Sequence, residues 1–358
     1  MVTLFALALG TAQAQTAADW SIYPTVLLTG ADVPYGSTVG SPSVIYDSVS
    51  DRYIMFFETF MANSPNCPAG DWGIGLATSP DGLNWNVSAN PLIAPDPTSP
   101  NPTYHSCVAA HPGAIYIPPS AGGAPGGTVY VYFKAEQASD ACAVLDPDPS
   151  WGCGQYTGVG SMRIRLRANG TISSTVVAPA PVLEKSVNFG YPKPLRYGDT
   201  MALSYTQYPD VYIATANTPT GPFTEQGVAL AAADYTSLSW VEDEFYNAAL
   251  ACLDQPNFPL RMFAGGRDND FGIVLNGGVG IAIADPSNIL TWTLAAAPQF
   301  AFSGDDSFRH WDVLRVGASS WLLYYDERDA SGANQVRLAT TLPSFTWNNA
   351  DVYAKYCF

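Results

Sequence analysis

A pattern of short strands recurs five times along this 358-residue chain, and this repetition limits the fold more than any other feature. Each copy opens with a short apolar segment, at residues 41–46, 111–116, 191–195, 246–250 and 311–315. Aromatic-rich segments follow at 53–57, 129–133, 201–205, 260–264 and 321–325, and third segments at 73–79, 160–164, 211–215, 279–283 and 335–340. Polar or glycine-containing turns separate these segments, which is typical of consecutive antiparallel strands.

The spacing of the copies favours a β-propeller. Their onsets are 55 to 80 residues apart, which suits four antiparallel strands with loops of variable length. We therefore predict an all-β fold, a five-bladed β-propeller with four-stranded antiparallel blades around a central funnel. We expect residues 21–28 to complete the last blade, because the two chain ends together contain about one blade. No amphipathic helical segments alternate with the strands, which argues against a two-domain α/β fold.

The first 14 residues are interpreted as a signal peptide. Val2 to Leu9 are almost wholly apolar, and Ala12-Gln13-Ala14 has the small-x-small pattern of a signal-peptidase site, although a basic n-region is absent. We expect a secreted or periplasmic monomer in which residues 15–358 form a single catalytic domain. No later segment approaches the roughly 20 apolar residues of a transmembrane helix.

Six cysteines form an even set, which in an exported chain allows up to three disulfides. Cys142 and Cys153 are the favoured pair, because they enclose a short loop rich in proline, aspartate and glycine. The connectivity of the others stays open. No C-x-x-C spacing indicates a structural zinc site, and three histidines are few for a multi-histidine zinc centre.

Acidic residues outnumber basic ones by 31 to 15, and the formal net charge is −16. Such a charge repels nucleic-acid phosphates and anionic lipids. Neither a nucleic acid nor a membrane surface is therefore an expected partner, and a neutral or cationic partner is favoured.

The propeller prediction indicates where a site would form. The start of each first strand and the end of each second strand lie at the same mouth of the funnel, so residues scattered through the sequence converge there. Residues that this rule and the search for ligand-binding side chains place at the mouth are Ser41, Glu58, His111, Lys134, Glu136, Tyr191, Lys193, Gln207, Glu242, Asp243, Glu244, Arg267, Asp268, His310, Asp312, Asp326, Glu327 and Arg328.

Glu244 is the favoured general acid within this set. It stands in an acidic triplet directly before a buried strand, flanked by Trp240, Phe245 and Tyr246. Apolar surroundings and like charges raise the pKa of a carboxyl group, as a proton donor near neutral pH requires. A solvated turn acid is the competing interpretation for the other acids of the mouth, such as Glu58 and Glu327.

The segment from Ile74 to Trp85, which reads IGLATSPDGLNW after a strand that starts x-Pro-x, resembles the blade sequence of five-bladed β-propeller glycoside hydrolases. That superfamily includes arabinanases, β-xylosidases, levanases, anhydrogalactosidases and β-mannoside phosphorylases. The resemblance implies a carbohydrate substrate. It makes Glu244 the acid if Tyr246 stands at the proline-like position, and it places His310 beneath a central metal ion or water. It therefore allows a structural Ca²⁺ or Na⁺ in the funnel, with no cofactor required.

The position of the base departs from the pattern of that superfamily. Ser41 stands where the first blade of arabinanase-like members has an aspartate, and the second blade offers His111. Asp243, Glu58 and Glu136 are the carboxylates that could replace it. His111 could itself transfer protons, or it could be a structural residue at the turn before Pro112.

Sugar binding needs flat aromatic platforms beside hydrogen-bonding groups. The predicted platforms are Trp151, Tyr191, Trp240, Tyr246 and Trp311, and the predicted polar contacts are Ser41, Lys193, Arg267, Asp268, Asp312, Asp326, Glu327 and Arg328. The cationic members suit an acidic or sulfated sugar, or they neutralise neighbouring acids.

Together these patterns predict a secreted glycoside hydrolase that uses two carboxylates, and the resemblance favours inversion at the anomeric carbon. Two alternatives remain open. One is a carbohydrate-binding propeller without catalysis, favoured by the missing aspartate at position 41. The other is a propeller hydrolase or lyase that acts on another class of substrate.

Overall fold

The computed structural model describes residues 20–64, 67–98, 103–120, 123–137, 155–241, 243–251, 260–270, 273–285, 288–303, 310–317, 319–353 and 355–357. Strands and short 3-10 turns make up the regular structure of these residues, which confirms the all-β prediction. None of the described segments contains a helix of sufficient length and apolarity to span a bilayer. The predicted leader, residues 1–14, lies outside the described residues.

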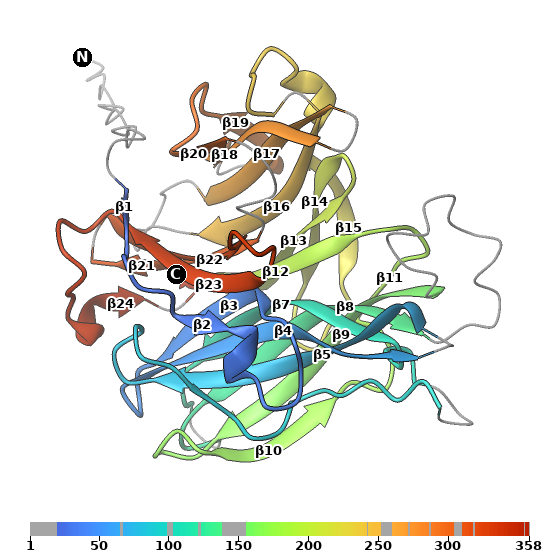
Figure 1. Ribbon diagram of the computed structural model, residues 1–358, viewed down its shortest axis with the longest axis vertical. Coiled ribbons are helices and arrows are strands. Elements are labelled where there is room, and N and C mark those ends of the chain that lie inside the picture. Colours follow the sequence, from blue (N-terminus) through green and yellow to red (C-terminus); the bar gives the residue numbers. More distant parts are fainter. Residues whose placement is uncertain are drawn as a thin grey trace, which may run out of the picture.

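The described strands form four hydrogen-bonded sheets, drawn in Figure 1. In the nine-stranded sheet, one parallel contact between β5 (Cys67–Ser79) and β7 (Val108–Ile117) joins two antiparallel groups, so we describe five groups of strands, the first four built on four main strands each. The first two groups are β3 (Gly40–Asp47), β4 (Arg52–Ser64), β5 (Cys67–Ser79) and β6 (Asn86–Val87), then β7 (Val108–Ile117), β8 (Thr128–Gln137), β9 (Gln155–Leu166) and β10 (Ile172–Val177). The next two are β12 (Gly190–Tyr197), β13 (Thr200–Gln207), β14 (Asp210–Ala216) and β15 (Thr224–Leu230), then β16 (Glu244–Ala251), β17 (Arg261–Asp270), β18 (Ile273–Asp285) and β19 (Asn288–Leu294). Short strands β11 (Leu183–Glu184) and β20 (Phe300–Ser303) pair with β9 and β18.

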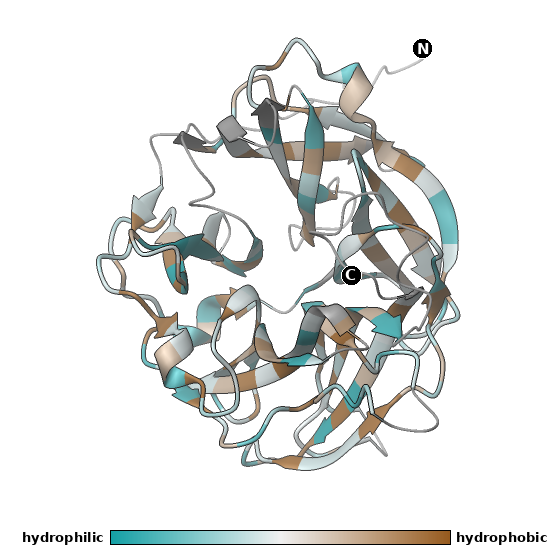
Figure 2. Cartoon of the chain, turned by 45° about the vertical axis from the view of Figure 1, so that its right-hand side comes forward, coloured by the Kyte–Doolittle hydropathy of each residue, from teal (hydrophilic) through white to brown (hydrophobic). Residues whose placement is uncertain are grey.

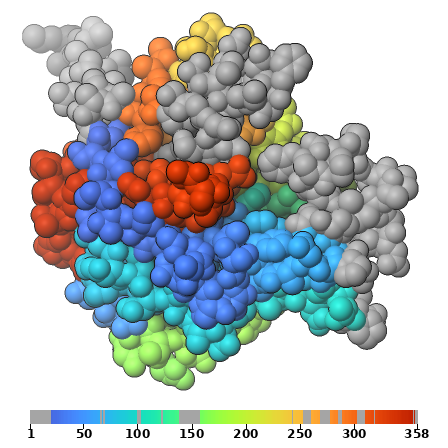
Figure 3. Space-filling model, viewed as in Figure 1, coloured from blue at the N-terminus to red at the C-terminus, as the bar shows by residue number. Residues whose placement is uncertain are grey.

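The fifth group joins the two ends of the described chain. Its strands β21 (Trp311–Val316), β22 (Ser320–Arg328) and β23 (Asn334–Thr340) are followed on the outer side by β1 (Ser21–Ile22) and β2 (Leu28–Thr29), which both pair with β23. This pairing confirms the expectation that residues 21–28 complete the last unit. The N-terminal segment, blue, lies against the C-terminal strands, red, in both the ribbon and the surface (Figures 1 and 3).

The C-terminal residues return to the inner strands. Strand β24 (Val352–Tyr353) pairs with β21, and β25 (Tyr356–Cys357) runs parallel to β12. The inner strands themselves make contact in cyclic order: β3 with β7, β7 with β12, β12 with β16, β16 with β21, and β21 with β3. A Cβ added to Gly113 of β7 would lie 1.8 Å from the carbonyl oxygen of Pro192 in β12, so glycine is what lets these two strands approach.

Packing between neighbouring groups builds the core. Hydrophobic residues, brown in Figure 2, occupy consecutive positions of the inner strands, so both faces of each sheet must be covered. One face of β4 supplies Met55 to a cluster that contains Leu322 of β22. The other supplies Ile54 to a cluster that contains Val131 of β8. Each sheet is therefore sandwiched between the sheets that precede and follow it.

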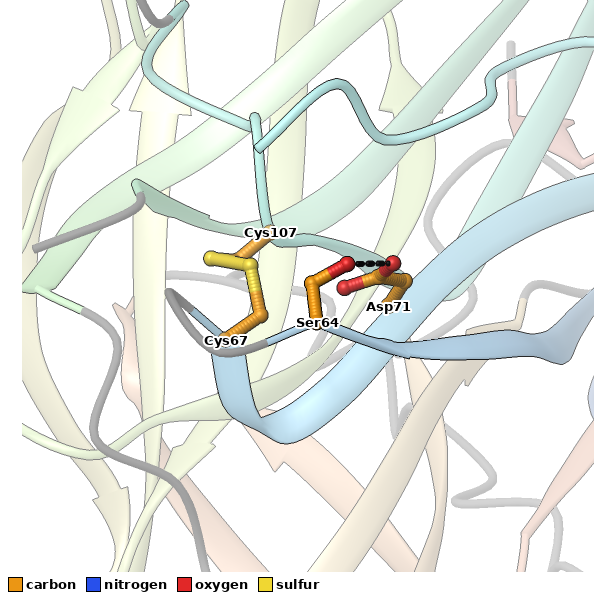
Figure 4. The surroundings of a disulfide bond; sticks show 4 residues. All are labelled: Ser64, Cys67, Asp71 and Cys107. Carbon is orange, nitrogen blue, oxygen red and sulfur yellow. Dashed lines mark hydrogen bonds between the residues drawn. A yellow bond between two sulfur atoms is a disulfide. The ribbon is translucent and has the colours of Figure 1, made fainter. Parts of the chain in front are cut away.

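A disulfide joins Cys67, at the start of β5, to Cys107, directly before β7 (Figure 4). Beside it Ser64 donates a hydrogen bond of 2.6 Å to Asp71. Sequence spacing did not single out this pair, because the two cysteines meet only where β5 and β7 pair in parallel at Trp72 and Val108. The favoured pair, Cys142 and Cys153, lies outside the described residues.

Removing this cross-link is expected to cost about 2–4 kcal/mol of unfolding free energy, because a disulfide restricts the unfolded chain. The two cysteines are 40 residues apart and both are buried, so alanine is the fitting replacement. Urea unfolding of Cys67→Ala/Cys107→Ala beside the oxidised wild type measures the loss. Equal midpoints and slopes for the two proteins would contradict the prediction.

Candidate active site

Three inner strands contain, near their N-terminal ends, a non-glycine residue in the left-handed backbone region, each directly before a proline. The φ angles are 47° at Ser41, 52° at His111 and 56° at Tyr191. The pairing register of each strand shifts at this point, so the residue bulges out of the ladder. Such conformations cost of order 1–3 kcal/mol and concentrate at functional sites. They mark this end of the inner strands as the candidate active site, which we call the mouth.

Two carboxylates face Gly40 at the mouth. Glu58 of β4 pairs opposite Gly40 in the strand register. A Cβ on Gly40 would lie 3.1 Å from Glu58 Oε1 and 2.8 Å from Asp326 Oδ2. A residue without a side chain is therefore needed here, and the first and fifth groups each contribute one acid to the same place.

Asp326 is wholly buried, and backbone and side-chain donors occupy both of its oxygens. His310 N donates to Oδ1 at 2.7 Å, Ser41 N donates to Oδ2 at 3.0 Å, and His310 Nδ1 lies 3.0 Å from Oδ2. Burial alone would raise the pKa of Asp326, but the charge of His310 and these hydrogen bonds lower it below its usual value. An ionised Asp326 therefore orients His310 and ties the bulge at Ser41 to the fifth group.

Three rings stack at the centre of the mouth. His111 and Tyr191 are stacked with centroids 4.0 Å apart, and Tyr191 and His310 with centroids 4.6 Å apart. Tyr191 Oη lies 2.8 Å from His310 Nε2, and its hydroxyl also hydrogen-bonds to Tyr208. Burial raises the pKa of Tyr208 to about 12, so this phenol is protonated at neutral pH. Sequence reasoning missed Tyr208, which directly follows Gln207 at the end of β13.

Glu58 has the environment of a proton donor. Burial raises its pKa, an effect that outweighs the opposing influence of His310 and of the hydrogen bond from His111 N to Oε2 at 2.9 Å. His111 Nε2 is also only 3.6 Å from Oε2. Burial and the charge of Lys134 lower the pKa of His111 well below 6.5, so this contact is not an ion pair at neutral pH.

Glu244, the predicted acid, is bound by Arg267. The two residues pair opposite each other in β16 and β17, and Arg267 Nε donates to Glu244 Oε1 within an ion pair. The guanidinium carbon also lies 5.0 Å from the ring centroid of Tyr246. Tyr208 interacts electrostatically with Arg267, Glu244 and Glu58, so the ion pair belongs to the same mouth.

A second ion pair lies beside His111. Lys134 Nζ is 2.8 Å from Glu136 Oε1, and both side chains are buried. Glu136, one of the predicted bases, is thus already paired. The structure brings together most of the predicted site: Ser41, Glu58, His111, Lys134, Glu136, Tyr191, Glu244, Tyr246, Arg267, His310 and Asp326.

Four predicted contact residues are buried and have partners within the protein. Lys193 and Asp312 are each 1% exposed, Lys193 donates to Pro112 O at 3.0 Å, and Asp312 pairs with Lys355. Lys193 still interacts electrostatically with Glu58 and Asp326 of the mouth. The rings of Trp240 and Trp311 are buried in core clusters and offer no exposed platform. These predictions share a cause. A residue at or near a strand start can direct its side chain either to the mouth or into the interface between sheets, and the sequence pattern does not distinguish the two.

Glu327 and two further predicted residues are partly or fully exposed. Glu327 accepts a hydrogen bond of 2.9 Å from Gln335 and lies 3.3 Å from Arg337, so it faces away from its neighbour Asp326. Asp243 and Arg328 are exposed. Glu242, Trp151 and the side chain of Asp268 lie outside the described part of the chain.

A metal ion at His310 does not fit the residues present. Both ring nitrogens of His310 already have partners, Asp326 at 3.0 Å and Tyr191 at 2.8 Å, which leaves no nitrogen lone pair for a metal. In addition, no group of three or more His, Cys, Asp or Glu suited to hold a metal occurs among the described residues.

No protein-family model matches the sequence, and no curated protein matches it significantly. Solved structures do match the fold. One is a candidate glycosidase from Bacteroides thetaiotaomicron, at 12% identity and a TM-score of 0.58, covering 92% of this chain and 98% of that chain. Another is a β-1,2-mannobiose phosphorylase from Listeria innocua, at 11% identity and a TM-score of 0.57, covering 90% and 96%. A fructofuranosidase from Schwanniomyces occidentalis matches at 13% identity and a TM-score of 0.55, covering 88% and 58%.

These likenesses confirm the resemblance that the sequence indicated, at the level of the fold. The chain has the fold of glycoside hydrolases and glycoside phosphorylases. A fold supports many chemistries, so what this chain does has to be argued from its own mouth.

Proposed function

We propose that the protein is a five-bladed β-propeller glycosidase, exported to an oxidising compartment, in which Glu58 donates the proton to the departing sugar oxygen. The cyclic contacts of the five inner strands and the likeness to glycosidase folds support the architecture. The disulfide between Cys67 and Cys107 supports export, because disulfides persist mainly outside the cytosol.

The observation that carries the proposal is the contrast between Glu58 and Asp326. Both face Gly40, yet the pKa of Glu58 is raised by burial while that of Asp326 is lowered overall by His310 and its hydrogen bonds. Neighbouring carboxylates with pKa values pushed apart are the mark of an acid and an ionised group in one site. Asp326 already accepts hydrogen bonds from Ser41 N and His310 N and lies 3.0 Å from His310 Nδ1, so its role in this proposal is to hold His310.

Glu244 is the second carboxylate of the proposed mechanism. Arg267 binds it in an ion pair and so holds it in place opposite β17. The roles predicted from the sequence are thereby exchanged: Glu58 protonates the leaving oxygen, and Glu244 takes a proton from the attacking water. The rings of His111 and His310, which are only partly buried, offer contacts for a sugar. Inversion remains the expected outcome.

The test is release of reducing sugar from a panel of neutral, acidic and sulfated polysaccharides and oligosaccharides, with NMR of the first product to identify its anomer. We expect turnover of at least one substrate. Retention of configuration would overturn the assignment of Glu244 as a base. Binding to a polysaccharide without turnover would support the carbohydrate-binding alternative, which Ser41 in place of an aspartate favours.

A further inference from the structure

A lysine near the chain end lies inside the ring of inner strands, below the mouth. Lys355 directly precedes β25, and its carbonyl oxygen accepts a hydrogen bond of 3.1 Å from the backbone nitrogen of Arg196 in β12. Its side chain is buried, and its ammonium group forms an ion pair with Asp312 of β21. The tail therefore links the third and fifth groups from within the ring.

Asp312 is the centre of a buried polar cluster. Its Oδ2 atom accepts the hydroxyl proton of Ser43 in β3, and Oδ1 accepts a hydrogen bond of 2.9 Å from Val313 N. The Ser43 hydroxyl in turn accepts a hydrogen bond of 2.9 Å from Ala114 N of β7. Asp312, only 1% exposed, thus connects inner strands of the first, second and fifth groups.

A second lysine enters the same cluster. Lys193 of β12 is 1% exposed and donates hydrogen bonds to Pro112 O at 3.0 Å and Pro42 O at 3.5 Å. It interacts electrostatically with Asp312 and with Lys355. The interior of the ring thus contains two ammonium groups around one carboxylate, whereas the resemblance allowed a structural Ca²⁺ or Na⁺ in the funnel.

We propose that Lys355 is the cation of this ring, supplied by the C-terminal tail in place of a metal ion. A buried carboxylate requires a positive partner, and the ion pair with Lys355 provides it. Ca²⁺ needs six to eight oxygen ligands, and two neighbouring ammonium groups would repel it. His310, the residue expected near such an ion, has both nitrogens engaged. This inference does not depend on the proposed reaction.

The experiment compares wild type with tail variants by metal analysis and thermal unfolding. We expect wild type purified without chelator to contain no stoichiometric metal, and its Tm to be unchanged by EDTA or by added CaCl₂. Lys355→Met removes the ammonium group that forms the ion pair with the buried Asp312 carboxylate, so we expect its Tm to fall by roughly 5–10 °C. Lys355→Arg keeps the charge and is the matched control, with a Tm near that of wild type.

A double variant keeps the test decisive if Lys355→Met does not fold. Lys355→Met with Asp312→Asn removes both charges, and we expect it to recover most of the lost Tm, because loss of a whole buried pair is tolerated better than loss of one partner. Stoichiometric metal in wild type with a lower Tm in EDTA would overturn the proposal. So would a Tm of Lys355→Met equal to that of wild type, or a double variant less stable than the single one.

Discussion

Glu58→Gln is expected to lower kcat by about 10²–10⁴-fold on any glycoside that wild type cleaves, because the amide has no acidic proton to donate to the leaving oxygen. The substitution keeps the shape of the side chain and the carbonyl oxygen that accepts the hydrogen bond from His111 N. Initial rates on the best substrate of the panel measure the effect. Glu184→Gln, at an exposed carboxylate of β11, is the control and should retain full activity.

Stability separates loss of catalysis from loss of folding in the same variant. Burial raises the pKa of Glu58 in the folded state above its ordinary value of 4.5. Its contribution to stability is therefore present below that value and is lost as the pH rises through the folded-state pKa. The glutamine of Glu58→Gln does not ionise. We therefore expect the free energy of unfolding, measured in urea, to fall less between pH 4 and pH 7 in this variant than in wild type. An inactive variant that is also less stable at pH 7 would contradict a catalytic role.

Trp311→Ala is expected to cost about 3–5 kcal/mol of unfolding free energy, the range for deletion of a large buried side chain. The ring is 0% exposed and rests directly on Gly265, where an added Cβ would lie 1.8 Å from it. Tyr246 packs edge-on against it with centroids 5.3 Å apart. Urea unfolding measures the loss, and Trp311→Phe should lose less because part of the ring volume remains.

The sequence had suggested instead that Trp311 is a sugar platform. A platform at the mouth would be exposed, so its removal would weaken carbohydrate binding and leave the unfolding free energy nearly unchanged. Affinity electrophoresis in polysaccharide gels beside the unfolding curves decides between these two outcomes. The buried position predicts that the loss appears in stability first.

Strand order was predictable because each unit repeats the same apolar segments between turn residues. Each predicted segment coincides with an observed strand, except that Leu260 directly precedes β17. The register was not, since the bulges at Ser41, His111 and Tyr191 depend on backbone angles that the pattern does not reveal. The location of the mouth could be predicted, because it follows from strand direction alone. The roles within it were not predictable in the same way.

The assignment of the acid shows the reason. Glu244 has the more acidic and aromatic neighbours in sequence, but its nearest partner in space is Arg267, from the facing strand. The environment of Glu58 is built by His111 and His310, which are distant in the chain. Lys355 was missed for a similar reason, since a lone lysine in a short tail carries no periodic signal.

The pairing of the N-terminal strands with β23 in the fifth group limits the order in which this chain can finish folding. Ser21 pairs with Thr340 and Leu28 with Val336, so the first described strands wait for partners made more than 300 residues later. Contacts of such long separation slow folding, because the loop entropy is lost before the contacts form. The fifth group therefore cannot be completed while the first four are being synthesised. Until β23 emerges, the backbone hydrogen-bonding groups of β1 and β2 that later pair with it have no strand partner.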